Sequence, residues 1–220
     1  MSIPQILKEN RFYTRLLLLF CAVGLLMMAK YPKGEIVMAV NAHYNPLLDI
    51  FFKYITYLGD GFVIIPLAIL IYLFKNRFHG ALILITYGLN SLIVQLMKRI
   101  LYLDMERPFE VLHRGLGYKF HEVEGVYINS IHSFPSGHAN SAFAFFMVLT
   151  FIAKDKRWGM LFFFIALMVA VSRMYLFQHF FMDVYAGMMY AFFITLGVYH
   201  FITKKTDWEE RLNTSFLNRK

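Results

Sequence analysis

Long apolar stretches without a charged residue recur along the chain, separated by short polar segments. They occupy residues 16–29, 61–74, 78–97, 139–153, 158–172 and 184–203. A helix needs about 20 apolar residues to cross a bilayer core, so the polar flanks of the shorter stretches must extend those helices toward the interface. The pattern predicts an all-α, polytopic membrane protein with six transmembrane helices.

A soluble helical protein is the alternative, but it would carry a polar stripe on most helices. The stretches 78–97 and 184–203 have almost none. Composition agrees, because 59% of the 220 residues are hydrophobic and only 16% are charged, against about 25% in soluble domains. We expect one domain, residues 1–220, embedded in the lipid bilayer.

Residues 41–59 show a different pattern. Apolar side chains recur there at helical spacing, with Asp49 and Lys53 elsewhere; they are Leu47, Leu48, Phe51, Phe52, Ile55 and Leu58. This pattern is typical of an amphipathic helix lying in the membrane interface. We expect such a helix before the second span.

The basic residues indicate the orientation. Short segments between alternate spans are densely basic, as at Lys75, Arg77 and 154–157, and such segments stay in the cytoplasm. Both termini are then cytoplasmic, and the long loop 98–135 lies outside. Topology therefore explains the net charge of +8 without a nucleic-acid partner, and no obligate protein partner is evident.

The segment 172–183, SRMYLFQHFFMD, places polar residues between two apolar runs. His179 and Asp183 are four residues apart, which on a helix puts them on one face. An aspartate beside a histidine fixes its tautomer and suits a nucleophilic or basic role. Alternatively, Arg173 and Asp183 only mark the ends of two helices.

The segment 134–143, FPSGHANSAF, has the features of a helix start. Ser136 can cap the helix, Gly137 allows close approach of a ligand, and free amides there can bind an oxyanion. His138 is placed to exchange a proton with that ligand. The alternative is a plain helix cap with an incidental histidine.

The segment 98–108, KRILYLDMERP, holds the bases Lys98, Arg99 and Arg107. Arginine and lysine both bind phosphate groups, although bases at a helix exit are also common. All three segments fall on the outer side in the expected topology. This arrangement predicts a phosphoryl-transfer site, because it gathers two histidines, an aspartate, an oxyanion-binding helix start and several bases on one face.

These segments resemble the catalytic motifs of the type 2 phosphatidic acid phosphatases, the PAP2 family. SRMYLFQHFFMD fits S-R-x5-H-x3-D, PSGH is intact, and KRILYLDMERP is similar to K-x6-R-P. The last motif differs from the family pattern, because eight residues instead of six separate Lys98 from Arg107. Either Lys98 keeps its role across an insertion, Arg99 replaces it, or this base is lost.

The resemblance implies a mechanism without metal or cofactor. His179 would attack phosphorus and form a phosphohistidine, Asp183 would hold its ring, and His138 would protonate the leaving oxygen and then activate water. The phosphoryl oxygens would be held by Lys98, Arg107, Ser136, Gly137 and Arg173. Two histidines and an aspartate also suit zinc or iron, but the arginines disfavour a cation.

The resemblance further implies a lipid phosphatase of a bacterial inner membrane, with its site facing the periplasm. Candidate substrates are undecaprenyl pyrophosphate, phosphatidylglycerophosphate or phosphatidate, and lipid A phosphates. A lipid phosphotransferase would use the same residues, and a non-enzymatic transporter or scaffold is a more distant alternative. Five other histidines are expected to be structural or solvated; they are His43, His113, His121, His132 and His200.

Overall fold

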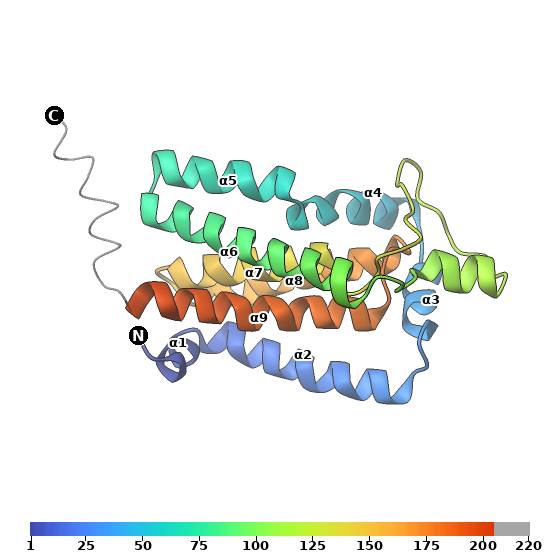
Figure 1. The fold of residues 1–220 in the computed structure, drawn as a ribbon, viewed down its shortest axis with the longest axis horizontal. Coiled ribbons are helices and arrows are strands. Elements are labelled where there is room, and N and C mark those ends of the chain that lie inside the picture. Colours follow the sequence, from blue (N-terminus) through green and yellow to red (C-terminus); the bar gives the residue numbers. More distant parts are fainter. Residues whose placement is uncertain (205–220) are drawn as a thin grey trace.

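A computed structural model describes residues 1–204, and every regular element in that range is helical (Figure 1). The helices run in chain order as α1 (Ile3–Glu9), α2 (Arg11–Lys30), α3 (Glu35–Ala42), α4 (Pro46–Ile55), η1 (Thr56–Gly59), α5 (Gly61–Phe74), α6 (Arg77–Leu96), η2 (Met97–Leu101), η3 (Phe109–Gly115), α7 (Gly137–Ile152), α8 (Trp158–Tyr175) and α9 (Phe181–Lys204). The prediction of an all-α fold is confirmed.

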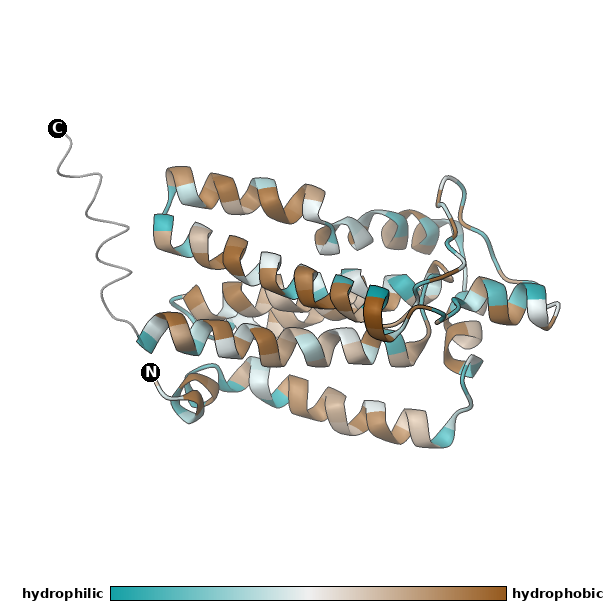
Figure 2. Ribbon diagram, viewed as in Figure 1, coloured by the Kyte–Doolittle hydropathy of each residue, from teal (hydrophilic) through white to brown (hydrophobic). Residues whose placement is uncertain are grey.

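Each of the six apolar stretches forms a helix, and the long helices lie side by side with brown, apolar surfaces (Figure 2). Four are long and apolar enough to cross a membrane, namely α2, α6 with η2, α8 and α9. The 14-residue α5 follows α4 and η1 with a bend of 54°, and α7 has only 16 residues. The number of six spans therefore stays a prediction.

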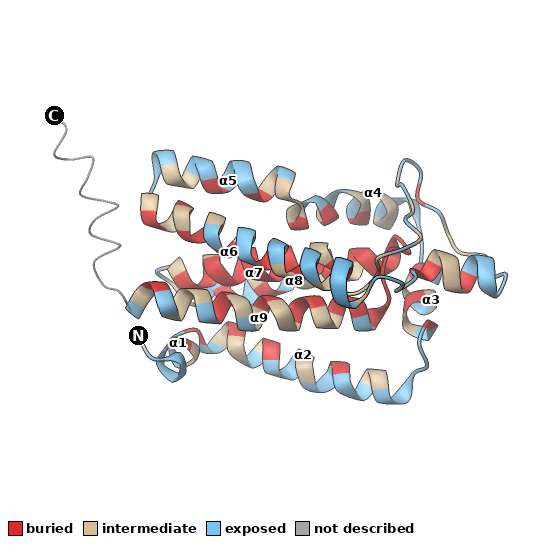
Figure 3. Ribbon diagram, in the orientation of Figure 1, coloured by how far each residue is buried: buried red, intermediate tan, exposed pale blue. Residues whose placement is uncertain are grey.

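Helix α7 lies at the centre of the bundle, where buried residues are concentrated (Figure 3). It packs against α6, α8 and α9. Small side chains on its surface, such as Ala139, Ala142 and Ala144, are fully or almost fully buried and let neighbouring helices approach closely. Because α7 is enclosed by other helices, its apolar sequence reflects contact with protein more than contact with lipid.

Two glycines bring other elements against the first turn of α7. A Cβ atom on Gly187 of α9 would lie 2.6 Å from the carbonyl oxygen of Ser136, and one on Gly59 of η1 would lie 2.5 Å from the carbonyl oxygen of His138. Both distances are shorter than van der Waals contact. Only glycine permits these approaches, which fix the surroundings of His138.

Helix α4 forms where the amphipathic helix was expected. Asn45 caps it by accepting hydrogen bonds from two backbone amides, and Pro46 occupies its first turn. On its polar side, Asp49 is partly exposed and accepts hydrogen bonds from Tyr175 Oη and His121 Nε2. These bonds join α4 to α8 and to the outer loop, while the position of α4 in the interface stays a prediction.

The N-terminus and the end of α9 lie at one end of the bundle, and the irregular loop with η3 lies at the other (Figure 1). The α5–α6 turn, which contains Lys75, shares the end of the N-terminus. This arrangement is compatible with the expected orientation, which stays a prediction. The basic C-terminal segment after Lys204, expected to be cytoplasmic, lies outside the described residues.

Candidate active site

The break between α8 and α9 holds His179. Phe177 adopts a left-handed backbone conformation (φ 55°), and the His179 amide donates to the carbonyl oxygen of Arg173. His179 precedes the first residue of α9, so the expectation that it shares a helix face with Asp183 is wrong. The pair still meets, since His179 Nδ1 lies 3.5 Å from Asp183 Oδ2, because the non-helical turn directs the ring back toward α9.

Asp183 is held by several hydrogen bonds. Its Oδ2 accepts from Ser133 Oγ (2.5 Å) and from the Phe180 amide (2.9 Å), and its carbonyl oxygen accepts from the Ser136 amide at 2.9 Å. No sequence pattern indicates a role for Ser133, a serine in an irregular loop. These contacts join the PSGH segment to the start of α9 and fix the carboxylate beside His179.

Arg107 reaches the same place from the outer loop and is 8% exposed. Its Nε donates to the Ile131 carbonyl, and one terminal nitrogen donates to the side-chain and backbone oxygens of Gln178. Burial lowers the pKa of Arg107 to about 10, an effect that Asp183 opposes. The guanidinium thus stays charged at neutral pH. Gln178 is a second residue that the sequence did not indicate.

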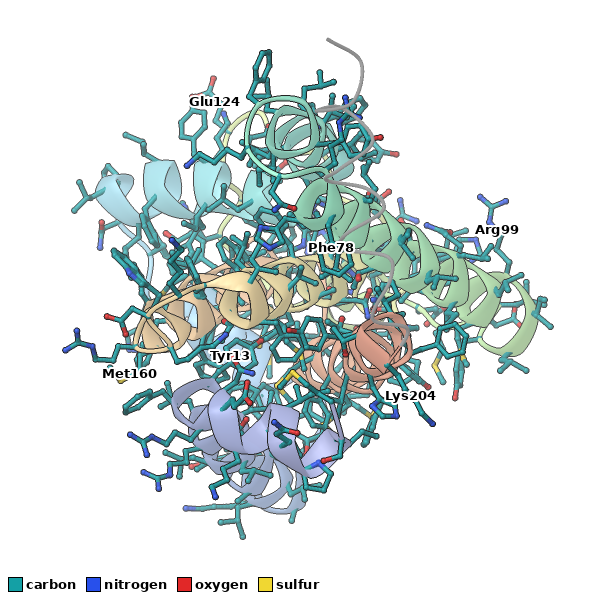
Figure 4. All side chains as sticks on the ribbon, turned by 90° about the vertical axis from the view of Figure 1, so that its left-hand side faces the viewer. Tyr13, Phe78, Arg99, Glu124, Met160 and Lys204 are labelled. Atoms are coloured by element: carbon teal, nitrogen blue, oxygen red, sulfur yellow. The ribbon has the colours of Figure 1, made fainter. Side chains whose placement is uncertain are left out.

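Lys98 and Arg99 lie in different surroundings. They belong to η2, a π-helical turn that ends α6. Such a turn accommodates an inserted residue without breaking the helix. Lys98 is 8% exposed, and its Nζ donates to the His132 carbonyl at 3.0 Å. Arg99 is exposed and points away from the bundle (Figure 4). The turn therefore directs Lys98 toward the site and Arg99 outward.

Arg173 and His138 lie near a third element, the η1–α5 junction. One terminal nitrogen of Arg173 donates to Thr56 Oγ1 at 2.8 Å, while its buried Nε has no partner among the described residues. His138 Nε2 lies 3.6 Å from Asp60 Oδ2. Asp60 also caps α5 by accepting from the Phe62 amide. The sequence motifs do not indicate a role for Asp60, because it is distant from all of them in the chain.

The PSGH segment starts α7 as expected. Ser136 is fully buried, and its Oγ accepts a hydrogen bond from the Ala139 amide at 3.4 Å. Gly137 is the first helical residue, and a Cβ atom there would meet nothing within 4 Å. The structure thus places Ser136 as a cap, with open space beside Gly137; a direct phosphate contact of either residue stays a prediction.

Positive charge dominates around His179. Burial, followed by the charges of Arg107, Lys98 and Arg173, holds the pKa of His179 well below its usual value. The ring is therefore neutral at physiological pH, with a lone pair available on one nitrogen. Within residues 1–204, no group of three His, Cys, Asp or Glu side chains is arranged to hold a metal ion. The arrangement suits an anion with several oxygens.

Most other histidines make local hydrogen bonds. His121 Nε2 lies 2.9 Å from Asp49, and its ring stacks on Tyr44 with 3.9 Å between ring centroids. His113 and His200 each place a ring nitrogen within hydrogen-bond distance of a carbonyl oxygen. These contacts agree with the expected structural role.

Comparisons with known proteins agree with this geometry. The family model described as the PAP2 superfamily matches residues 79–207. Phosphatidylglycerophosphatase B from Bacillus subtilis (strain 168) is 30% identical over 174 residues, which cover 70% of this chain and 76% of that protein.

Two solved structures have a similar fold. One is LpxE from Aquifex aeolicus, with a TM-score of 0.66, 24% identity, and coverage of 79% of this chain and 98% of the other. The second is the first transmembrane PAP2 type phosphatidylglycerolphosphate phosphatase from Bacillus subtilis, with a TM-score of 0.62, 24% identity, and coverage of 89% and 96%. Together with the family match, the apolar helices make this chain an integral membrane protein.

Proposed function

The chain belongs to the PAP2 superfamily, and we propose that it is a metal-independent phosphatase of membrane lipid phosphates or pyrophosphates that acts through a phosphohistidine. The observation that carries the proposal is the neutral, buried His179 beside Asp183, surrounded by Lys98, Arg107 and Arg173. A lipid phosphatase is also the class of its named relative from Bacillus subtilis.

In the first step, His179 attacks phosphorus. Its Nδ1 faces Asp183, so Nε2 is the nitrogen that forms the P–N bond. The bond between phosphorus and the leaving oxygen breaks, and protonated His138 gives its proton to that oxygen. Asp183 stabilises the positive charge that develops on the His179 ring.

In the second step, water replaces the enzyme nitrogen. His138, now neutral, accepts a proton from water, whose oxygen attacks phosphorus as the P–N bond breaks. The released products are inorganic phosphate and the dephosphorylated lipid. The carboxylate of Asp60, 3.6 Å from His138 Nε2, and the negative charge of a bound phosphate favour the protonated form that the next cycle requires, which burial and the charge of Arg173 oppose. Asp60 is thus a positioning residue in this proposal.

The phosphoryl oxygens are bound by positive and amide groups. Arg107 and Arg173 each use one terminal nitrogen on protein oxygens, which leaves the remaining N–H groups for the phosphate. Lys98 adds a charge, and the amide of Gly137 lies at the helix start. Ser136 acts mainly by fixing this turn.

We expect Lys98 to fill the first-motif position, and Arg99 to be dispensable. Lys98→Met removes a buried charge beside the developing charge on the phosphoryl group, so kcat/KM for a lipid phosphate should fall on the order of 10²-fold. Arg99→Met, its exposed neighbour, should stay within about threefold of wild type, as is usual for surface changes. Steady-state phosphate release measures both, and a larger loss for Arg99→Met would contradict the assignment.

The site is proposed to face the periplasm at the outer surface of the inner membrane. The positive-inside distribution supports this orientation, and apolar helices around the site suit a substrate that stays in the leaflet. Among the candidate lipids, the name of the Bacillus subtilis relative favours phosphatidylglycerophosphate. Undecaprenyl pyrophosphate, phosphatidate and lipid A phosphates are the other members of the panel below.

The direct test is phosphate release in detergent micelles, with a chelator and no added metal. We expect the wild-type protein to release inorganic phosphate from at least one of the four lipids, with no change when the chelator is omitted. Mass spectrometry of the lipid product separates hydrolysis from transfer to a second lipid. Absence of release from every lipid, or activity that appears only with a metal ion, would refute the proposal.

A further inference from the structure

A polar cavity adjoins His138 and shares Gly137 with the proposed phosphate-binding groups. Its volume is about 190 Å³, and its lining includes Asp60, Tyr87, Ser91, Gln95, Gly137 and His138. None of His179, Arg107 or Arg173 lines it. The cavity therefore meets the proposed site on the side of the general acid, where the leaving group must be.

Gly137 leaves this space open. A Cβ atom at Gly59 or Gly187 would collide with neighbouring backbone, whereas one at Gly137 would meet no atom within 4 Å. Protein packing thus does not require glycine at this position. The open volume beside the first amide of α7 is available to a bound molecule.

One wall of the cavity is a short row of polar side chains on α6, a helix expected from its sequence to have almost no polar stripe. Tyr87, Ser91 and Gln95 are spaced four residues apart, so they share one face. Gln95 is exposed, and no hydrogen bond among the described residues involves the side chain of Ser91 or Gln95. Polar groups without partners near lipid are costly and are by default functional, so these two side chains are available to a ligand.

The cavity continues into an apolar groove. Asp60, Gly61 and Tyr87 line both spaces, and the groove proceeds along Phe62 and Ile65 of α5, which are 90% and 39% exposed. A molecule bound here would place its polar part near His138 and its apolar part along α5. That distribution is the one found in a lipid headgroup with its chains.

We propose that this cavity binds the leaving alcohol, and that Gln95 and Ser91 recognise a free hydroxyl next to the leaving oxygen. A glycerol phosphate headgroup, as in phosphatidylglycerophosphate, provides such a hydroxyl; phosphatidate does not, because its neighbouring oxygen is acylated. A volume of about 190 Å³ exceeds the roughly 150 Å³ of an engineered cavity that binds benzene, so it has room for a small polyol. The proposal rests on the lipid phosphatase function above.

The test compares two lipids that differ by one hydroxyl: phosphatidylglycerophosphate and its analogue with propanediol in place of the terminal glycerol. Wild type should prefer the hydroxyl-bearing lipid about tenfold in kcat/KM, the effect of one hydrogen bond lost from a polar site. Gln95→Leu should reduce this ratio to about one, because leucine cannot bind the hydroxyl. Since Gln95 is exposed, the change should not disturb packing.

Leu96→Ala is the matched control, as it alters an exposed neighbour on α6 that does not line the cavity, and it should keep the wild-type ratio. Equal use of the two lipids by wild type, or an unchanged ratio in Gln95→Leu, would overturn the leaving-group assignment while leaving the phosphatase function intact. If wild type hydrolyses neither of these lipids nor any other lipid in the panel, the proposed function itself fails.

Discussion

His179→Asn is expected to lower kcat/KM for a lipid phosphate by at least about 10³-fold, equivalent to about 4 kcal/mol of transition-state stabilisation. Asparagine has no nucleophilic nitrogen, so the P–N bond cannot form. The loss should appear in kcat as well, since the covalent step is removed and the bases that bind phosphate remain. Steady-state phosphate release and trapping of an acid-labile, alkali-stable phosphoenzyme measure the effect, and only wild type should yield the phosphoenzyme.

His121→Asn provides a matched control for that experiment. His121 is also a histidine beside a carboxylate, with Nε2 at 2.9 Å from Asp49, but it is only partly buried and lies in the outer loop beside α4. We expect its activity to stay within about threefold of wild type. A phosphoenzyme in His179→Asn, or equal losses in the two variants, would show that His179 is not the nucleophile.

The sequence indicates the reactive groups of the site better than it indicates their supports. His138, His179 and Arg107 are recognisable because their types and positions at helix ends are costly unless used. Ser133 and Gln178 are not costly residue types, and the position of Asp60 at the start of α5 is already explained by its role as a helix cap. They reach the site only through tertiary contacts, such as the close approach that Gly59 and Gly187 allow, and local sequence patterns contain no information about those contacts.

The hydrophobic pattern likewise predicts helices better than it predicts their surroundings. Helix α7 and the largely exposed α5 both have apolar sequences, yet α7 is enclosed by protein. Apolar side chains are compatible with both environments, so the pattern cannot distinguish them. On α4, the pattern places Asp49 on the polar side, but it contains no information on the partners Tyr175 and His121, which are 126 and 72 residues away in the chain.

His138→Ala is expected to separate the two chemical steps. With lipid phosphates, whose alkoxide leaves poorly, loss of the general acid should lower kcat/KM about 10²- to 10⁴-fold. An aryl phosphate with an acidic phenol needs no proton to leave, so its phosphoryl group should still transfer to His179. Attack by water remains slow without His138, and phosphoenzyme should therefore accumulate.

The measurable sign is a burst of one equivalent of phenol per enzyme, followed by slow turnover, in His138→Ala but not in His179→Asn. Asp60→Asn should show the same selective loss of kcat/KM on lipid phosphates, to a smaller degree. Asp60 Oδ2 lies 3.6 Å from His138 Nε2, and a neutral amide in its place no longer favours the protonated ring. If His138 had only a structural role, the substitution would lower kcat/KM for lipid phosphates and aryl phosphates by the same factor and give no burst. The dependence on the leaving group therefore distinguishes proton transfer at His138 from packing at the start of α7.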